Sequence, residues 1–532
     1  MLLDLGEISF FDYTFSYFGS HPHSIIKLLS WLDYRFTGGR QLLTAAISLL
    51  CFALYGCFLA NLFFSWAKKN LQGSSYVLII GIIIALLSTD LADWEVTTLP
   101  FQSVLSISRF FYIFLLWLFL SVLKKGTGSQ LRILAVAAGI ATTFHGAGFI
   151  FAILWLIIGL VHCRRIQHLA TSFLPIAVWF LQAYFYKNSS ELNGVSNLVS
   201  LEGITNFITA FLVYFATPLS PFYDTSNKED FIFFGLIMAI FTIYLALLGM
   251  LRLFRFRSVT SGSKAQIDEL SYAGVLCTFV LLSGLAASAL MVVRAGPLAD
   301  LYVLTTSRYI SYATLPYILF VIFLAQLSQK FKKIQPVCIT GITLVLLISA
   351  YPTLSYERIH SPKLGLDKAV ALISAGVSPL EVDAMFIWPN AKDDWYWVSA
   401  LPKTTSYLKQ NRTGPWHNLP RLGESYSGST KGIPIEDLVY SNPSTIPDSS
   451  LSAFEGTLKK RIPSSYLDSG VFPILDEDGL VVGFAYQKQA SDLFHVAGIV
   501  NRKIGHKLDN LHIGPRDGSY IGKALTSSLG TH

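Results

Sequence analysis

The stretch FIFFGLIMAIFTIYLALLGML, residues 231–251, contains no charged side chain over its whole length. Because a helix needs about 20 apolar residues to cross a bilayer, this stretch predicts a membrane-spanning helix. Similar apolar segments lie near 42–66, 75–92, 105–123, 132–144, 149–163, 169–186, 271–293, 311–328 and 335–352. Together they predict a polytopic α-helical membrane protein with about ten spans. A shorter segment, 203–217, is followed by Pro218 and Pro221, and we expect it to be re-entrant.

The composition agrees with this class. Charged residues make up 14% of the 532-residue chain and hydrophobic residues 52%, and the mean hydropathy is +0.51. A soluble domain carries about 25% charged residues, so a soluble enzyme, a disordered protein and a DNA-binding module are excluded. We interpret the net charge of +7 as a sign of membrane topology, and we expect no nucleic-acid partner.

The basic residues between the apolar segments predict the orientation. They form five clusters, at Lys68–Lys69, Lys124–Lys125 with Arg132, Arg164–Arg165, Arg252/Arg255/Arg257 and Lys330/Lys332/Lys333. Because cytoplasmic loops are rich in lysine and arginine, we place all five in the cytoplasm, with segment 203–217 entering and leaving on the outer face. Residues 1–41 and a soluble domain of residues 353–532 then flank a transmembrane domain of residues 42–352. Both flanking regions, and both termini, are expected outside the cytoplasm.

Residues 1–41 predict two short amphipathic helices. Phe11, Phe15 and Phe18 follow a helical spacing, as do the apolar residues between Ile25 and Leu32. Gly19-Ser20-His21-Pro22 separates the two helices, and Gly38-Gly39 ends the second. Helices of this kind lie in the headgroup plane, either as a membrane anchor or as a lid over an active site.

The C-terminal region predicts a loop-rich α/β or β-rich domain. Residues 363–376 suggest a short helix, and residues 471–486 suggest a β-hairpin whose turn contains Asp476-Glu477-Asp478-Gly479. Residues 420–450 are rich in Ser, Pro and Gly, and we expect them to form an irregular linker.

No nucleotide-binding, hydrolase or metalloprotease motif occurs, which disfavours an ATP-driven pump. The five cysteines lie in or beside apolar segments, and no CxxC pair occurs. We therefore expect no disulfide framework and no zinc site. We also expect no cofactor, with a divalent cation as the alternative. Ionisable residues placed near one face of the membrane are the remaining candidates for chemistry.

Two carboxylates in the N-terminal segment are candidate catalytic bases. Asp12 and Asp33 lie in the two amphipathic helices, where a partly desolvated carboxylate can accept a proton. The alternative is that both merely solvate the polar helix faces. The spacing of His21 and His23 does not suit two metal ligands on one helix face, and we assign His23 to substrate binding.

A second cluster suits carbohydrate. Asp93, Trp94 and Glu95 follow the second apolar segment, and Gln102 lies shortly after them. An indole can cover the apolar face of a sugar while carboxylates bind its hydroxyls. Trp94 is equally expected as an aromatic residue at the membrane interface.

A third cluster is cationic and faces outward in this topology. Arg109, Arg294, Arg308 and Tyr309 are candidate phosphate contacts, since arginine offers a fork of donors that matches phosphate oxygens. The alternative is snorkelling to the outer headgroups. Arg109 is the most informative because it lies inside an apolar run. His145, among small residues between two apolar segments, is either a packing residue or a substrate contact.

The arrangement resembles the polytopic GT-C-type glycosyltransferases of bacterial cell-envelope polysaccharide loci. The resembling pieces are Ser20 to His23 with Leu28 to Tyr34 and Gly38-Gly39, Trp94 with Pro100 to Gln102, Ala141 to Gly148, and Ser307 to Tyr309. The likeness covers the layout of residues 8–352 and includes no signature motif. It implies a GT-C-like fold in the bacterial inner membrane, with an active site at its outer face.

The resemblance also implies roles. The donor would be a polyprenyl-phosphate-linked sugar, and the acceptor a glycan or a lipid-linked saccharide. By position Asp12 best matches the catalytic acid of the first outer loop, with Asp33 second. Asp93 or Glu95 matches a later acidic position, and Arg308 matches a donor-phosphate contact. Such proteins usually have a spanning helix before the interfacial helices, whereas this chain reaches them almost at once, which leaves the role of Asp12 open.

Three hypotheses follow. The first is a glycosyltransferase that acts on envelope polysaccharide or its lipid-linked precursor. The second is a transporter, flippase or polymerase-like handler of lipid-linked oligosaccharide, which should show inverted repeats with broken helices. The third is a structural protein that displays its C-terminal domain.

Overall fold

The structure is a computed structural model of the chain. It describes residues 9–15, 24–38, 42–88, 103–125, 127–162, 166–185, 200–222, 228–255, 268–295, 307–354, 367–377, 405–411, 416, 419–427, 432–441, 451–458, 471–489, 492–502, 504, 510–515 and 520–521. Internal contacts divide the chain into two compact units. One consists of residues 8–32 and 42–354, and the other of residues 1–7, 33–41 and 355–532.

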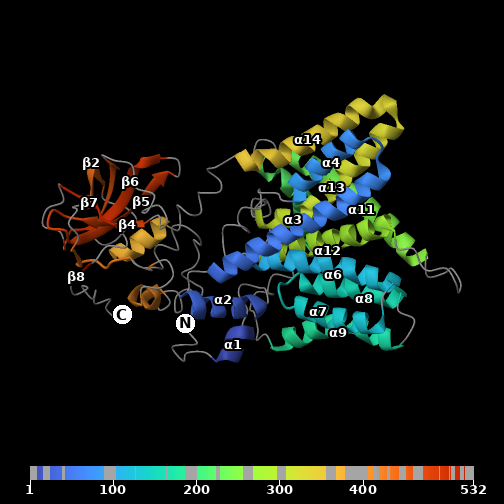
Figure 1. Cartoon of the computed structure of the whole chain (residues 1–532), viewed down its shortest axis with the longest axis horizontal. Helices are drawn as coiled ribbons and strands as arrows, with labels where there is room; N and C mark the ends of the chain where they lie inside the picture. Colours follow the sequence, from blue (N-terminus) through green and yellow to red (C-terminus); the bar gives the residue numbers. More distant parts are fainter. Residues whose placement is uncertain are drawn as a thin grey trace. The chain divides into compact units, whose positions relative to one another are not determined.

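The first unit is a bundle with a helix at every predicted apolar segment (Figure 1). Its helices are α3 (Leu42–Asn70), α4 (Ser74–Ser88), α6 (Ser103–Lys125), α7 (Gly128–Ala141), α8 (Gly148–His162), α9 (Ile166–Phe185), α10 (Leu201–Ala216), α11 (Lys228–Arg255), α12 (Glu269–Ala295), α13 (Ser307–Lys330) and α14 (Gln335–Leu354). A 3₁₀ turn, Thr217–Phe222, follows α10 at the two predicted prolines.

Five of the described helices are long and apolar enough to cross a membrane. They are α3, α6, α11, α12 and α13. The expectation of a helical, membrane-embedded protein is therefore confirmed at this coarser level. The count of about ten spans, the re-entrant role of α10 and the GT-C-like arrangement stay predictions.

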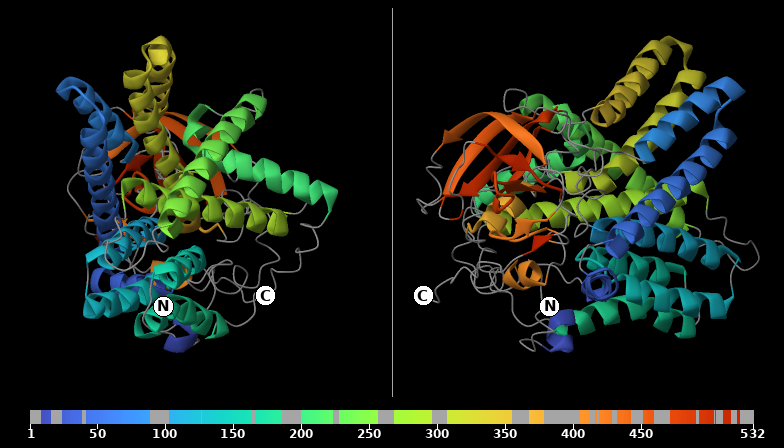
Figure 2. Two further views of the ribbon diagram at one scale, coloured as in Figure 1. Left: turned by 90° about the vertical axis from the view of Figure 1, so that its right-hand side faces the viewer. Right: turned by 60° about the vertical axis from the view of Figure 1, so that its left-hand side comes forward.

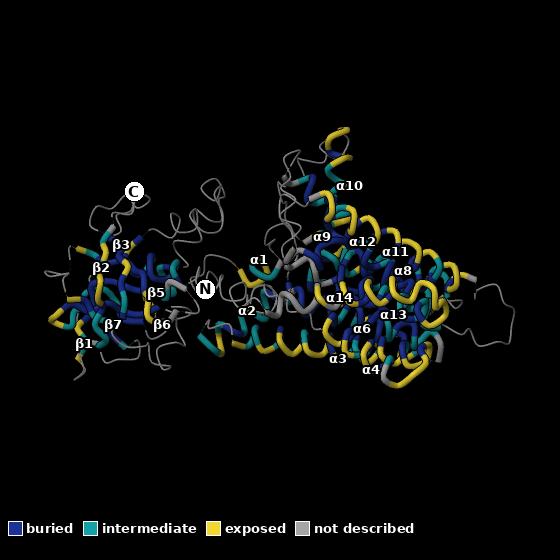
Figure 3. Tube along the Cα trace, turned by 90° about the horizontal axis from the view of Figure 1, so that it is seen from above, coloured by how far each residue is buried: buried dark blue, intermediate teal, exposed yellow. Residues whose placement is uncertain are grey.

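Helix α11 shows why the bundle suits a lipid environment. Phe231, Met238 and Leu245 recur every seven residues and are buried against neighbouring helices. The opposite face repeats the same spacing with exposed apolar side chains, such as Phe233 and Ile240. Both faces of this helix are apolar, but only one is buried against protein. The exposed apolar face is suited to contact with the hydrocarbon chains of a membrane. Figure 3 shows the same division across the bundle, with buried positions inside and exposed ones outside.

Small residues allow close helix packing. Gly249 of α11 and Gly274 of α12 face each other so closely that a Cβ on either would clash with the backbone of the other helix. Gly159 of α8 meets Ser172 of α9 in a similar way. Without a hydrophobic driving force in lipid, such approaches provide much of the packing energy. Figure 2 shows the bundle from two further directions.

The N-terminal segment forms the two predicted helices, α1 (Phe10–Phe15) and α2 (Ser24–Thr37). The ring of Phe10 meets the ring of Trp31 edge-on at 5.7 Å. The Tyr13 hydroxyl donates a hydrogen bond to the Lys27 carbonyl at 3.1 Å, so the two helices are joined as a hairpin. Phe18, the last member of the predicted apolar stripe, lies outside the described residues.

The last part of α2 belongs to the second unit, which begins again at Asp33. There the hydroxyl of Tyr34 donates to the hydroxyl of Tyr407 at 3.0 Å. Residues 405–410 and 367–375 are helical, and the second of these stretches confirms the short helix predicted at 363–376. Apolar residues of the helix over 367–375 share a core with Trp416 and with residues of the strands described next.

The centre of the second unit is a closed antiparallel β-barrel, so the expectation of a β-rich domain is confirmed. Its strands follow one another in the order β2 (Ile433–Ser441), β3 (Leu451–Leu458), β6 (Asp492–Asn501), β5 (Val481–Gln489), β4 (Val471–Leu475) and β7 (His512–Ile513). Strand β7 pairs with both β2 and β4 and thereby closes the ring. Two further short strands, β1 (Ser425–Tyr426) and β8 (Tyr520–Ile521), pair with each other.

The predicted hairpin is present and the predicted linker is wrong. Strands β4 and β5 pair antiparallel around the turn at Asp476, whose carboxylate accepts the backbone N–H groups of Asp478 and Leu480. Gly479 has a φ of 77°, which glycine adopts without strain. Residues 433–441, in contrast, form a barrel strand within the segment expected to be irregular. The sequence pattern misled because a bulge near Asp437 interrupts the apolar alternation.

Candidate functional site

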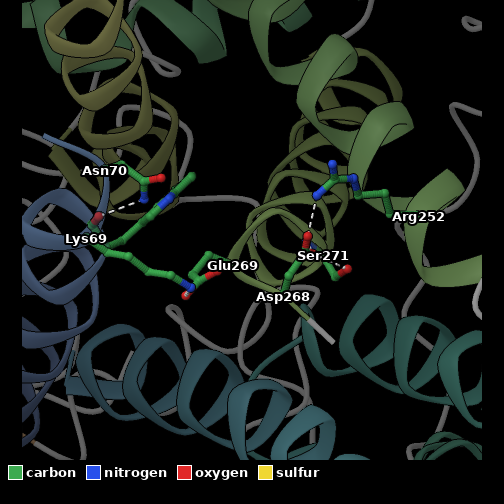
Figure 4. Close-up of polar contacts among 7 residues, drawn as sticks. Lys69, Asn70, Arg252, Asp268, Glu269 and Ser271 are labelled. Carbon is green, nitrogen blue, oxygen red and sulfur yellow. Dashed lines mark hydrogen bonds and ion pairs between the residues drawn. The ribbon is translucent and has the colours of Figure 1, made fainter. Parts of the chain in front are cut away.

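The two ends of the helical bundle differ in chemistry. Lys69 of α3 pairs with Glu269 at the start of α12 at 2.7 Å, and Arg252 of α11 pairs with Asp268 (Figure 4). Gln329 of α13 exchanges two hydrogen bonds with the backbone of Gln72, at 2.9 and 2.6 Å. The C-terminal ends of α3, α11 and α13 therefore meet at one end of the bundle, which we name the basic end.

This arrangement brings together basic clusters that the sequence places on one side. Asp268 also begins α12 as its cap, because its carboxylate accepts the backbone N–H and the hydroxyl of Ser271 at 3.0 and 2.8 Å. Burial raises the pKa of this carboxyl, but the Ser271 hydrogen bonds and the Arg252 charge outweigh it and hold the pKa below its ordinary value. The side of the membrane on which the basic end lies stays a prediction.

Arg109 is the central residue of the candidate site. It lies in the second turn of α6, inside the candidate span Leu105–Leu123, and only 3% of it is exposed. Along the helix it is about 24 Å from Lys125 at the basic end, taking about 1.5 Å per residue. Its guanidinium stands 5.1 Å from the ring centroid of Tyr55 in α3, a cation–π distance. The cation is thus buried within protein near the opposite end of the bundle.

Further polar groups lie around this part of α6. The hydroxyl of Ser48 in α3 donates to the hydroxyl of Ser106 at 3.1 Å, and both are buried. Three residues beyond Arg109, the hydroxyl of Tyr112 donates to the carbonyl of His145 at 3.3 Å. These hydrogen bonds join α3, and the turn between α7 and α8, to the part of α6 that carries Arg109.

His145 is held in one orientation by its own turn. Its Nδ1 accepts the backbone N–H of Ala147 at 3.1 Å, and the side chain is half-buried. A neutral imidazole that accepts at Nδ1 carries its proton at Nε2, so the outer nitrogen is a donor. This geometry suits the predicted contact with a substrate oxygen.

The two predicted bases differ in environment. Asp12 is exposed, and its Oδ2 accepts the hydroxyl of Ser9 at 2.7 Å while its N–H donates to the same hydroxyl at 3.0 Å. These contacts make Ser9 and Asp12 a cap for α1. Asp33 is 1% exposed, on the same face of α2 as the buried Ile26 seven residues earlier. Of the two carboxylates, Asp33 is therefore the buried one and Asp12 the exposed one.

Several predicted site residues lie outside the described residues, namely His23, Asp93, Trp94, Glu95 and Gln102. Arg294 lies near the end of α12, and Arg308 and Tyr309 lie at the start of α13. The structure describes the backbone of these three and not their side chains. Their predicted contacts with sugar or phosphate stay predictions. In the part of the chain that is described, no group of three His, Cys, Asp or Glu side chains could hold a metal ion.

Two features of the structure were not predicted from the sequence: a groove beside the α1–α2 hairpin, and the contact between Tyr55 and Arg109. The groove lies between the α1–α2 hairpin and helices α7 and α9. Tyr55, which faces Arg109, is 54 residues away in the chain, so no local pattern links the two. Comparison of the chain with known protein families, with curated proteins and with solved structures finds no match.

Proposed function

We propose that the protein is a membrane glycosyltransferase that moves a sugar from a polyprenyl-phosphate donor to a glycan or lipid-linked acceptor. The observation that carries the proposal is the burial of Arg109 within a candidate span. A cation in the membrane interior is costly, by about 2.5–3.5 kcal/mol on insertion scales, and such residues usually serve function.

An anionic group of a membrane-soluble substrate explains such a cation. The guanidinium is planar, stays charged and offers a donor fork that fits phosphate oxygens. A lipid-linked phosphate can reach this depth because its chain is soluble in the bilayer. Arg109 is proposed to stabilise the charge that develops on the departing lipid phosphate, and His145 Nε2 is proposed to donate to a substrate oxygen.

Transfer also needs a group that accepts the proton of the acceptor hydroxyl. The two candidates for this role are Asp12, which belongs to the same unit as Arg109, and the buried Asp33, which belongs to the other unit. The acceptor oxygen then bonds to the anomeric carbon of the sugar while the bond from that carbon to the phosphate oxygen breaks. The lipid phosphate leaves with the bonding electron pair, so no nucleotide is consumed.

A transporter of lipid-linked saccharide is the second candidate. Alternating access requires both ends of a bundle to open in turn. The basic end is fastened by the Lys69–Glu269 and Arg252–Asp268 pairs and by the bonds between Gln329 and Gln72. These contacts join α3, α11, α12 and α13, but the ion pairs are exposed and each contributes little to stability, so this end can open as a transporter requires.

The test uses the full chain in proteoliposomes with a radiolabelled hexose on undecaprenyl phosphate and with extracted envelope glycan as acceptor. Arg109→Gln should lower transfer on the order of 100-fold, as loss of a charge-stabilising donor does elsewhere. Arg132→Gln is the matched control, because Arg132 is an exposed arginine of α7. Equal transfer by the two variants would exclude the role of Arg109.

The base is tested in the same assay. Loss of transfer in Asp33→Asn, with transfer retained in Asp12→Asn, assigns the base to Asp33. The Asp12→Asn variant keeps the α1 cap, because an amide oxygen still accepts the Ser9 hydroxyl. The reverse order of effects would assign the role to Asp12. Movement of the labelled lipid across the bilayer without any transferred sugar, in wild-type protein, would favour the transporter.

A further inference from the structure

A groove of about 440 Å³ opens on the surface of the helical bundle. It is lined by Thr14 of α1, by Ser24, Ile25 and Leu28 of α2, by Val136 and Ile140 of α7, by Thr143, and by Leu174 and Val178 of α9. In Figure 1 the α1–α2 hairpin lies beside α7 and α9. Residues of all four helices line the groove. A space of this size is within the range of sites that hold small ligands, roughly 300–1,000 Å³.

The walls are suited to hydrocarbon. Six of the nine lining residues are aliphatic, and the other three are Thr14, Ser24 and Thr143. The Thr14 hydroxyl donates to the Phe10 carbonyl at 2.8 Å and the Thr143 hydroxyl to the Ile140 carbonyl at 2.7 Å. These two hydroxyl protons are already used within the protein, so they offer little to a sugar.

The groove is accessible from the surrounding lipid. Val136 and Ile140 are 52% and 51% exposed although both line it. Thr143 lies just beyond the end of α7, and Val136 lies two turns earlier, toward the basic end. An occupant can therefore enter sideways from the bilayer and run from the helix end toward its middle.

The cation near the groove is Lys27, which follows the lining residue Ser24 by three residues on α2 and does not itself line the groove. Lys27 lies between the lining residues Ile25 and Leu28 on α2, and its ammonium is 5.9 Å from the ring centroid of Tyr13, next to the lining residue Thr14. Burial lowers the pKa of Lys27 to about 8, so the group remains mostly protonated at neutral pH. A partly desolvated cation beside an apolar groove is complementary to a lipid that carries one negative charge.

We propose that this groove binds one acyl chain of an anionic phospholipid of the surrounding membrane, with the lipid phosphate at Lys27. The chain fills the space between Leu28 on one wall and Ile140 and Val178 on the other, and so fixes the α1–α2 hairpin to α7 and α9. The site does not depend on the proposed transfer reaction. Its open walls, in which six of nine residues are aliphatic and two hydroxyls already donate within the protein, favour a bilayer phospholipid over a lipid with a sugar head.

The experiment uses the full chain in nanodiscs of phosphatidylcholine that contain phosphatidylglycerol with a photoreactive group in one acyl chain. After illumination, mass spectrometry measures the adducts on peptides from α7 and α9. Ile140→Trp, which fills the groove, should lower these adducts at least fivefold. Ile133→Trp is the matched control, because Ile133 is exposed on the same face of α7 and does not line the groove.

A second pair of variants tests the headgroup contact and does not alter the groove volume. Lys27→Gln should lower labelling by phosphatidylglycerol at least threefold, whereas Lys27→Arg, which keeps the charge, should be labelled as strongly as wild type. Thermal unfolding of each variant shows whether it is folded. If Ile140→Trp is not folded, the labelling of the two Lys27 variants decides whether the proposal holds. Equal labelling of Ile140→Trp and Ile133→Trp, both folded, or equal labelling of Lys27→Gln and wild type, overturns the proposal. Displacement of the probe by undecaprenyl phosphate and not by phosphatidylglycerol also overturns it, in favour of the isoprenoid lipid.

Discussion

Gly274→Ala should destabilise the helical bundle, because Gly274 of α12 lies against Gly249 of α11. A Cβ at position 274 would collide with the Cα of Gly249 and stand 2.8 Å from its carbonyl carbon. Both contacts are to backbone, which no rotamer change can relieve. The two helices must separate to accept the methyl group.

The size of the effect follows from two opposing terms. Overpacking in a tight interior costs about 1–3 kcal/mol. Alanine in a helix gains back up to about 1 kcal/mol relative to glycine. At Gly341 the new Cβ would meet only the Cδ1 atom of Leu324, at 2.9 Å, which is the end of a flexible side chain. Gly341→Ala is therefore expected to be neutral or stabilising, and Gly274→Ala to lower the free energy of unfolding by about 1–2 kcal/mol.

The assay is thermal unfolding in detergent, followed with a dye that fluoresces when it reacts with a thiol. Cys277, one turn from Gly274, is buried together with Cys51 and Cys338, whereas Cys57 is exposed and gives the starting signal. In a protein with Cys51 and Cys338 replaced by Ala, Cys277 reports the opening of α12. We expect Gly274→Ala to unfold roughly 2–8 °C below wild type. Unfolding of Gly274→Ala at or above the temperature of Gly341→Ala would show that α11 and α12 do not touch through their backbones.

Three further predictions concern stability. Burial, with the Arg421 charge second, lowers the pKa of Lys409 to about 8; above that pH the unfolded chain keeps a proton that the folded chain releases. Denaturation of the C-terminal unit should therefore show a free energy of unfolding that rises by up to roughly 3 kcal/mol between pH 8 and 10.5. The free energy of unfolding of Lys409→Met should not change with pH in this range. A wild-type profile as flat as that of Lys409→Met contradicts the reasoning. Asp268→Ala should cost about 1 kcal/mol in thermal unfolding at neutral pH, and since its folded pKa is lowered, the difference from wild type should vanish as the pH falls below about 4. Gly479→Ala should destabilise the barrel by about 1 kcal/mol in chemical denaturation, because its φ of 77° strains any residue with a Cβ; an unchanged midpoint contradicts this.

The sequence was informative where one local signal decided the structure. Hydropathy alone located α11 to within a few residues at either end, because a span needs an uninterrupted apolar run. The β4–β5 hairpin followed from its acidic, glycine-containing turn. Arg109 stood out because a charge in an apolar run is rare.

Tertiary contacts were beyond local patterns. Strand β2 escaped notice because its bulge breaks the alternation and its partners β3 and β7 come later in the chain. Asp12 and Asp33 look alike in sequence, and only packing makes one exposed and the other buried. One signal was readable all the same, since Ser9 precedes Asp12 by three residues, which is the spacing of a helix cap.

The closure of the barrel limits how the C-terminal domain can recognise another molecule. A sheet with a free margin can accept an extended peptide as an additional strand through backbone hydrogen bonds. The ring from β2 to β7 closes through the two residues of β7, which pair with Ile433 and Pro434 of β2 and with Ile474 and Leu475 of β4. A partner that meets the barrel where it is closed is recognised by side chains and connecting loops, so its specificity can change by loop substitution while the barrel itself stays the same.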